Sequence, residues 1–177
     1  MIHIWERCMS KERQAQSELY QLFAPKMYAV CLRYARDQDE ANDILQNGFI
    51  KVFSKGHLYE GKGSLEGWIR RIMVNTAIES HRSNKIIFLS TEELEREEIG
   101  KIATFSVNHL DYKDLLALIK KLPMGYRTVF NLYAIEGYNH KEIASMLAIS
   151  EGSSKSQLSR ARTWLKERIQ KMEELGI

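Results

Sequence analysis

Residues that restrict or cross-link the backbone are scarce in this chain. Its 177 residues include 2 prolines and 2 cysteines. No stretch approaches the roughly 18 consecutive apolar residues that a membrane-spanning helix needs, and the first residues lack the charged-then-apolar order of a secretory signal. We therefore expect a folded, cytoplasmic protein that does not insert into a membrane.

The sequence also lacks the patterns of a metal centre or a catalytic site. Cys8 and Cys31 cannot form a zinc site by themselves, and the 5 histidines show no ligand spacing around them. There is neither a phosphate-binding glycine loop nor a nucleophile elbow, so we expect no cofactor and no enzymatic activity. Cys31 should be a buried apolar residue. A disulfide between the two cysteines stays possible but is disfavoured in a reducing compartment.

Helical periodicity dominates what is present. Strand-like alternation is rare, which predicts an all-α protein, with two small helical domains at residues 1–83 and 111–177 and a linker at 84–110. Basic and acidic side chains number 12 and 10 in the first domain, 3 and 5 in the linker, and 11 and 8 in the second domain. Basic ends around an acidic middle suggest two units that face nucleic acid.

Four helices are expected in the first domain. Pro25 should separate the first helix from a second one that runs to Tyr34, because proline disfavours helix at the residue before it. Asp37 or Asp39 can cap the third helix, which should end at Lys55. The segment that follows has glycines at 61 and 63 and no apolar period. It is expected to be an exposed loop before a fourth helix, which Ser64 caps and which should run from Leu65 to about His81.

The second domain should end in a DNA-binding helix-turn-helix. Pro123 is expected to open a helix that stops at Gly137. Asn139, with a glutamate three residues later, is a helix-start signature, so a short helix should run to Leu147. Ser150 then caps the next helix, which starts at about residue 151.

Along that last helix, Ser154, Leu158, Ala161 and Leu165 fall on one side at helical spacing. The groups left to meet phosphates and base edges are Ser153, Lys155, Ser156, Gln157, Ser159 and Arg160. Residues 155–171 hold six basic side chains and one acid. An ordinary amphipathic helix hairpin also fits the apolar spacing, but its solvated face would more often mix signs, so the charge favours docking in the major groove.

Two separate stretches carry a family resemblance. Residues 39–53 and 63–77 closely resemble region 2 of the extracytoplasmic-function (ECF) group of bacterial sigma factors. Residues 122–138, leading into the helix-turn-helix, resemble region 4 of the same group. The similarity covers about residues 10–83 and 111–170, in the order and separation of that family.

The resemblance implies a sigma subunit that binds core RNA polymerase and promoter DNA. Region 2 would bind the polymerase and open the −10 element, and region 4 would read the −35 element. The family also implies an anti-sigma factor as a partner that covers the polymerase-binding surfaces. Two rival hypotheses remain: a transcription factor that uses the helix-turn-helix without engaging polymerase, and a helical protein-interaction module with no DNA role.

Site residues follow from the matched positions. The family's core-binding positions are occupied by Asp39, Asp43, Gln46 and Phe49. The acids and the amide can pair with a basic surface while Phe49 inserts as an apolar anchor, although Phe49 fits a core position equally well. The −10 group comprises Tyr59, Lys62, Trp68, Arg70, Arg71 and Asn75. Such aromatic and cationic groups suit single-stranded DNA and a flipped base, although Trp68 could simply pack inside.

Three positions depart from the family pattern. Asn42 replaces an acid, Ala148 replaces a turn glycine, and Ser154 replaces a branched apolar residue. A left-handed Ala148 would cost on the order of 1 kcal/mol. The hydroxyl of Ser154 is expected to bond back to the preceding helical turn.

Overall fold

The computed structural model describes residues 2–83 and 112–174. Within these ranges every regular element is helical, which confirms the expected all-α class. The chain divides into two compact units, residues 1–80 and 81–177. The expected linker at 84–110 lies outside the described residues.

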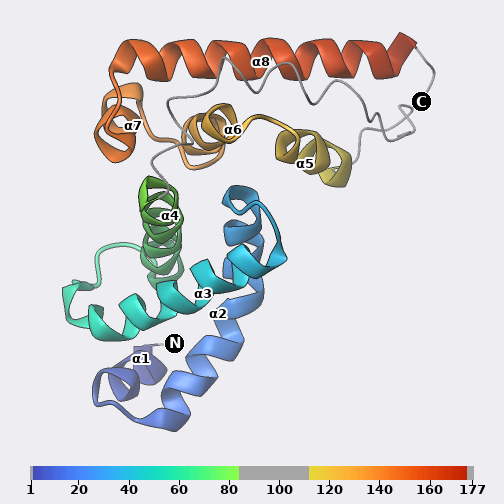
Figure 1. The fold of residues 1–177 in the computed structure, drawn as a ribbon. Coiled ribbons are helices and arrows are strands. Elements are labelled where there is room, and N and C mark those ends of the chain that lie inside the picture. The colour runs from blue at the N-terminus through green and yellow to red at the C-terminus, as the bar shows by residue number, and fades with distance from the viewer. Residues whose placement is uncertain (1, 84–111, 175–177) are drawn as a thin grey trace. The chain divides into compact units, whose positions relative to one another are not determined.

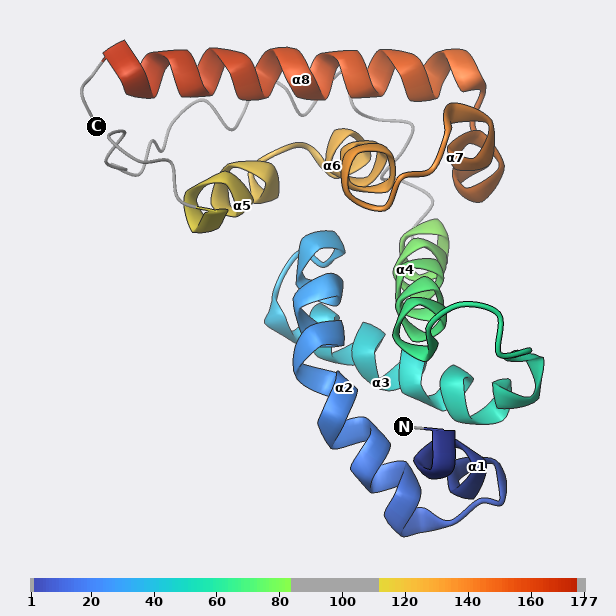
Figure 2. The same ribbon diagram turned by 180° about the vertical axis from the view of Figure 1, so that it is seen from behind.

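The N-terminal unit is a bundle of helices around one apolar core (Figures 1 and 2). Its elements are α1 (Ile2–Met9), α2 (Arg13–Tyr34), α3 (Gln38–Ser54), the short 3₁₀ turn η1 (Gly56–Leu58) and α4 (Leu65–Ser83). Helix α2 packs against both α1 and α3. Side chains of α3 contact side chains of α4, as the bond from Lys51 to Thr76 illustrates.

Pro25 does not separate two helices, so that prediction is wrong. Helix α2 continues through it, although proline has no N–H to donate to the carbonyl four residues earlier. Leu19 and Phe23 before it and Met27 and Val30 after it are all buried. They keep one spacing of three to four residues, so burial of a single apolar face along the helix outweighs the lost backbone bond.

The expected helix starts at Asp37 and Ser64 are confirmed. The Asp37 carboxylate accepts a hydrogen bond from the Glu40 N–H at 2.8 Å and caps α3. The Ser64 hydroxyl accepts one from the Gly67 N–H at 3.0 Å at the start of α4. These bonds satisfy backbone donors that the first turn of a helix leaves free, and they fix where α3 and α4 begin.

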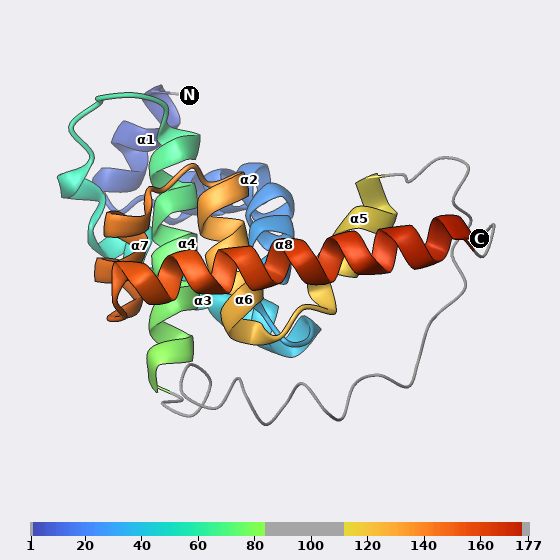
Figure 3. The same cartoon turned by 90° about the horizontal axis from the view of Figure 1, so that it is seen from above.

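The C-terminal unit is organised along one long helix (Figure 3). Its elements are α5 (Tyr112–Lys120), α6 (Met124–Phe130), the π-helical turn η3 (Asn131–Ile135), α7 (His140–Leu147) and α8 (Glu151–Glu174). Helices α7, α6 and α5 follow one another along α8. Pro123 precedes α6, as predicted, and Gly137 takes a positive φ of 79° after η3.

A continuous apolar core holds α5 and α6 against α8. Its buried members are Leu118, Ile119, Leu122, Tyr126, Ala161, Leu165 and Met172. The expected inward positions of α8 are confirmed, since Leu158, Ala161 and Leu165 are buried. This packing presents the opposite side of α8 to solvent.

Candidate nucleic-acid interfaces

A row of exposed side chains runs along one face of α3. Asp39, Asp43 and Gln46 lie three to four residues apart and are all exposed, so they share one face of the helix. Ile50 extends the row and is 65% exposed, far more than is usual for a large apolar residue. We call Asp39, Asp43, Gln46 and Ile50 the α3 surface; it offers two carboxylates, an amide and an apolar end.

Phe49 does not belong to that surface. Its side chain is 3% exposed, and its ring centroid lies 4.7 Å from that of Tyr20 and 6.0 Å from that of Phe53. Position 49 falls on the side of α3 that packs inward, together with buried Leu45 and Val52. The core alternative for Phe49 is therefore the one the fold supports, and Ile50 is the apolar side chain that is free to meet a partner.

The loop between η1 and α4 is fixed by glycines and by one internal bond. Gly61 and Gly63 have φ angles of 73° and 81°, a region that a side chain makes costly. The Tyr59 hydroxyl donates to the Gly63 carbonyl at 2.9 Å and closes the loop on itself. The loop therefore has a defined shape despite its exposure.

Three aromatic rings pack together at the base of this loop. Trp5 of α1 lies 5.7 Å from Tyr59 and 5.6 Å from Trp68, and Tyr59 lies 5.5 Å from Trp68, measured between ring centroids. These distances and their tilted or edge-on geometry are typical of favourable aromatic pairs. Trp68 is accordingly half-buried. The contribution of a third ring from α1 was not predicted.

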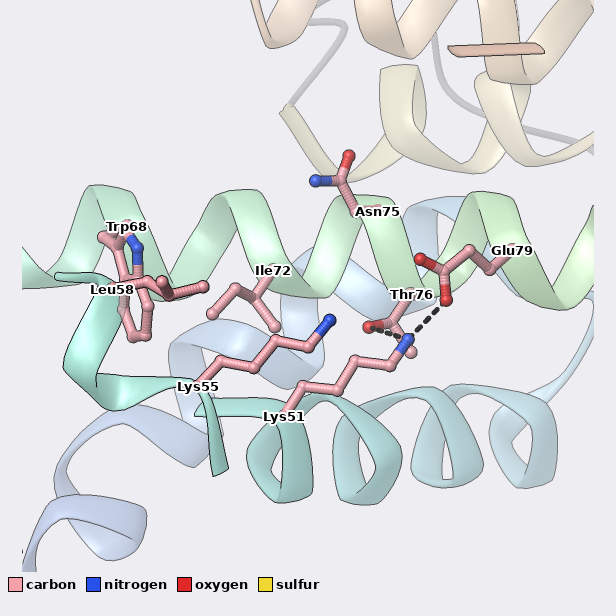
Figure 4. A pocket seen from close by; sticks show the side chains of 8 residues that line it. All are labelled: Lys51, Lys55, Leu58, Trp68, Ile72, Asn75, Thr76 and Glu79. Atoms are coloured by element: carbon pink, nitrogen blue, oxygen red, sulfur yellow. Dashed lines mark hydrogen bonds and ion pairs between the residues drawn. The ribbon is translucent and has the colours of Figure 1, made fainter. Parts of the chain in front are cut away.

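A pocket of about 170 Å³ opens between α3 and α4 beside these rings (Figure 4). Its lining residues are Lys51, Lys55, Leu58, Trp68, Ile72, Asn75, Thr76 and Glu79. The Lys51 ammonium donates to the Thr76 hydroxyl at 3.2 Å and pairs with the Glu79 carboxylate at 2.5 Å. The lining thus combines an aromatic wall, an amide and two lysines with one carboxylate, which Lys51 neutralises. Lys55 and the aromatic wall can hold a base and its phosphate.

The pocket gathers only some of the predicted −10 residues. Trp68 and Asn75 line it, and Tyr59 contacts Trp68 from the loop. Lys62 is exposed on the loop and pairs with Glu60 at 2.6 Å.

Arg70 is half-buried and Arg71 is exposed, and neither lines the pocket. Sequence reasoning missed Lys51 and Lys55. Their spacing of four residues just before the loop could have revealed them, because it places both cations on one side at the C-terminal end of α3.

The helix-turn-helix forms as predicted. Asn139 and Glu142 make a complete capping box at the start of α7, with bonds of 2.9 and 2.8 Å. Ala148 ends α7 in the left-handed conformation, at φ 55° and ψ 44°, so the anticipated strain is present. The Ser150 hydroxyl accepts from the Ser153 N–H at 3.0 Å and caps α8.

The exposed side of α8 carries most of the predicted DNA-facing residues. Lys155, Ser156, Ser159 and Arg160 are exposed. Ser153 is half-buried. The Arg160 guanidinium also donates to the Tyr126 hydroxyl at 3.0 Å, which braces it against α6.

Gln157 is a correction, because its side chain is 8% exposed. It lies three residues after Ser154 and four before Ala161, so it shares their inward side of the helix. Its amide nitrogen donates to the Ser153 hydroxyl at 3.3 Å. Ser154 also differs from expectation, since its hydroxyl lies 2.9 Å from Nδ1 of His140 rather than bonding back along α8.

Across the described residues, no helix is both long and apolar enough to cross a membrane. The described residues also contain no group of three His, Cys, Asp or Glu side chains placed to hold a metal ion.

Comparison with known proteins places both units in one protein family. Residues 19–86 match the family described as Sigma-70 region 2, and residues 112–165 match the one described as Sigma-70, region 4. The ECF RNA polymerase sigma factor SigM of Bacillus subtilis is 27% identical over 150 residues, which cover 84% of this chain and 91% of SigM. The chain belongs to the sigma-70 family, in its ECF group of RNA polymerase sigma factors.

Two solved structures share the fold. The sigma factor RpoE from Bartonella quintana, in complex with the anti-sigma factor NepR, superposes with a TM-score of 0.52 at 22% identity. That match covers 88% of this chain and 96% of RpoE. CnrH, in complex with the cytosolic domain of CnrY, gives a TM-score of 0.50 at 18% identity and covers 94% of this chain and 95% of CnrH.

Proposed function

We propose that the chain is a specificity subunit that binds core RNA polymerase through the α3 surface, opens the −10 element at the pocket beside α4, and reads the −35 element with α8. The observation that carries the proposal is that two family-matched units each present an exposed interface of fitting chemistry. The proposed site of action is the cytoplasm, where core polymerase and the chromosome are.

The α3 surface suits a basic protein partner. Asp39 and Asp43 offer carboxylates, Gln46 offers both a donor and an acceptor, and Ile50 adds exposed apolar area at the end of the row. Charge complementarity mainly sets orientation and association rate, while a central apolar side chain contributes most to affinity.

The chemistry of the pocket suits an unstacked base of single-stranded DNA. Trp68 supplies an aromatic wall, while Lys55 and Asn75 supply ionic and hydrogen-bonding groups around it. Unstacking a base costs a few kcal/mol, and stacking on an aromatic side chain recovers about 1–3 kcal/mol per base. Strand opening at this pocket therefore needs no nucleotide energy once polymerase holds the DNA.

An anti-sigma factor is a proposed regulatory partner. Support comes from the two solved relatives, each of which is bound to a named partner, the anti-sigma factor NepR in one and a cytosolic domain in the other. A partner that covered the α3 surface would compete directly with polymerase for the same four side chains.

The proposal is tested by measuring promoter binding with the chain alone, core polymerase alone, and both together. Fluorescence anisotropy of a labelled duplex should rise at low concentration only with both, because core polymerase would hold the two units where both can contact one promoter. Asp43→Ala combined with Gln46→Ala should abolish that rise, whereas Gln170→Ala, exposed on α8, should leave it unchanged.

Tight binding of the duplex by the chain alone would instead favour a transcription factor that works without polymerase. Loss of all DNA binding, with core polymerase present and the protein folded, would favour an interaction module.

A further inference from the structure

A buried polar pair joins the two helices of the helix-turn-helix. Ser154 of α8 is 0% exposed, and its hydroxyl lies 2.9 Å from Nδ1 of His140, the first residue of α7. A buried hydroxyl is costly without a partner, so this bond matters for how the two helices meet.

The same histidine also stacks on a third element. Its ring centroid lies 4.7 Å from that of Tyr133 in η3, with 25° between the ring planes. Arg162 of α8 lies over the Tyr133 ring, 5.6 Å from the centroid. Contacts among Tyr133, His140, Ser154 and Arg162 therefore link η3, α7 and α8 in a closed circuit.

The first turn of α7 is itself held in place. Asn139 and Glu142 exchange two hydrogen bonds across that turn, and His140 lies between them in sequence. His140 projects from this fixed turn and bonds to Ser154 of α8, so the bond fixes the orientation of α8 relative to α7. An apolar contact at position 154 would allow the helices to slide, because a hydrogen bond constrains both distance and angle and an apolar contact does not.

We propose that His140 and Ser154 are positioning residues for −35 recognition: their hydrogen bond sets how α8 crosses α7 and hence where the α8 side chains meet DNA. Ser154 is too buried to touch DNA, but Ser153 and Lys155 flank it on the same turn. The inference rests on the proposed function of α8. The bond forms with either neutral tautomer of His140, since a serine hydroxyl both donates and accepts.

Three variants separate the hydrogen bond from ring stacking. Ser154→Ala removes the hydroxyl, and His140→Phe keeps a ring to stack on Tyr133 but removes the nitrogen. His140→Asn keeps a polar atom near the Nδ1 position and removes the ring. A promoter selected from a random library by wild-type holoenzyme, and the same promoter with its −35 element scrambled, provide the substrates.

The readout is the ratio of holoenzyme affinities for the two promoters, measured beside thermal unfolding of each free variant. Ser154→Ala and His140→Phe should each reduce that ratio by about 2- to 10-fold, the range expected for one hydrogen bond. The double variant should be no worse than either single one, because both remove the same bond. His140→Asn should retain most of the wild-type ratio.

Two results would overturn the inference alone. If the variants lower only the Tm and leave the affinity ratio unchanged, the pair is merely structural. If His140→Phe is harmless and His140→Asn is damaging, stacking rather than the hydrogen bond positions the helix. A wild-type holoenzyme that ignores the −35 element would contradict the proposed function itself and the inference with it, which is a distinct outcome.

Discussion

Gly48 lies where α3 meets α4, and the space for its side chain is already filled. A Cβ at this position would overlap the sulfur of Met73, whose side chain is fully buried. We expect Gly48→Ala to lower the free energy of unfolding by about 1–3 kcal/mol, the usual cost of overpacking a core.

Gly152→Ala is the matched control for Gly48, because its Cβ would meet nothing closer than the Ser150 hydroxyl at 3.7 Å. That change should be neutral or stabilise by about 0.5–1 kcal/mol, as alanine does in an exposed helix. Urea unfolding of both variants checks the pair. If the two substitutions changed the free energy of unfolding equally, overlap with Met73 would not be the cause of the destabilisation at position 48.

Cys31 predicts a pH dependence of stability. Burial raises the pKa of its thiol from 9.0 to about 12, so the folded state keeps a proton that the unfolded state releases. The contribution is fully present below pH 9 and is lost as pH rises toward 12. The difference in unfolding free energy between wild type and Cys31→Ala should therefore shrink from pH 8 to pH 11.

Urea titrations of both proteins at each pH measure that difference, and other titrating groups cancel because the two proteins share them. A constant difference across the range would contradict the burial of the thiol.

The burial of Cys31 could be predicted from the sequence, since a lone cysteine at an apolar position of a helical period has few other roles.

At the scale of elements, the turn of the helix-turn-helix stores strain at Ala148. Its left-handed backbone suits glycine, so Ala148→Gly should stabilise the protein by about 1 kcal/mol. Ala144→Gly, inside α7, should destabilise it by a similar amount, because there glycine only adds unfolded-state freedom. Thermal unfolding measures both. A fall in Tm for Ala148→Gly would contradict the strain.

Neighbouring residues of α3 should behave in opposite ways. Phe49→Ala removes a buried ring and should cost about 3–5 kcal/mol of stability. Ile50→Ala should change stability by less than about 0.5 kcal/mol but weaken holoenzyme formation, because Ile50 belongs to the α3 surface. Urea unfolding and a polymerase pull-down check the pair; full polymerase binding by Ile50→Ala would remove this residue from the interface.

Elements with explicit end signals could be predicted from the sequence. Asp37, Ser64 and the capping box at Asn139 each fixed a helix start to within a residue or two. Pro25 misled the prediction, because its local cost is overridden by burial on both sides, which depends on the tertiary fold. Helix α1 was missed because its 8 residues make only about two turns, too short a segment in which to recognise a helical period.

The sequence predicted which helix faces carry the candidate sites, but not which side chains on those faces are buried. Helical spacing placed Asp39, Asp43 and Gln46 on one exposed face. It could not decide whether Phe49 belonged to that face or to the core, and Ile50 was not considered. Gln157 was assigned outward for its polarity, whereas its angle on the helix places it inward. The bond between His140 and Ser154 joins residues fourteen apart, and no local pattern encodes it.

Considered as a whole, the chain carries two compact units, and we propose that each one binds a separate target. Tethering two weak sites on one chain raises the effective concentration of the second once the first is engaged, so recognition becomes strong only when both meet their targets. Core polymerase would supply the fixed frame that lets both units contact one promoter. We therefore expect selectivity from the complex rather than from the free chain.

Run-off transcription with purified core polymerase tests this division of labour most directly. Adding the chain to core enzyme and a promoter library should yield transcripts with defined start sites. Asp43→Ala combined with Gln46→Ala should remove them. Unselective transcription that is unchanged by the chain, with no inhibitory partner present, would contradict the account.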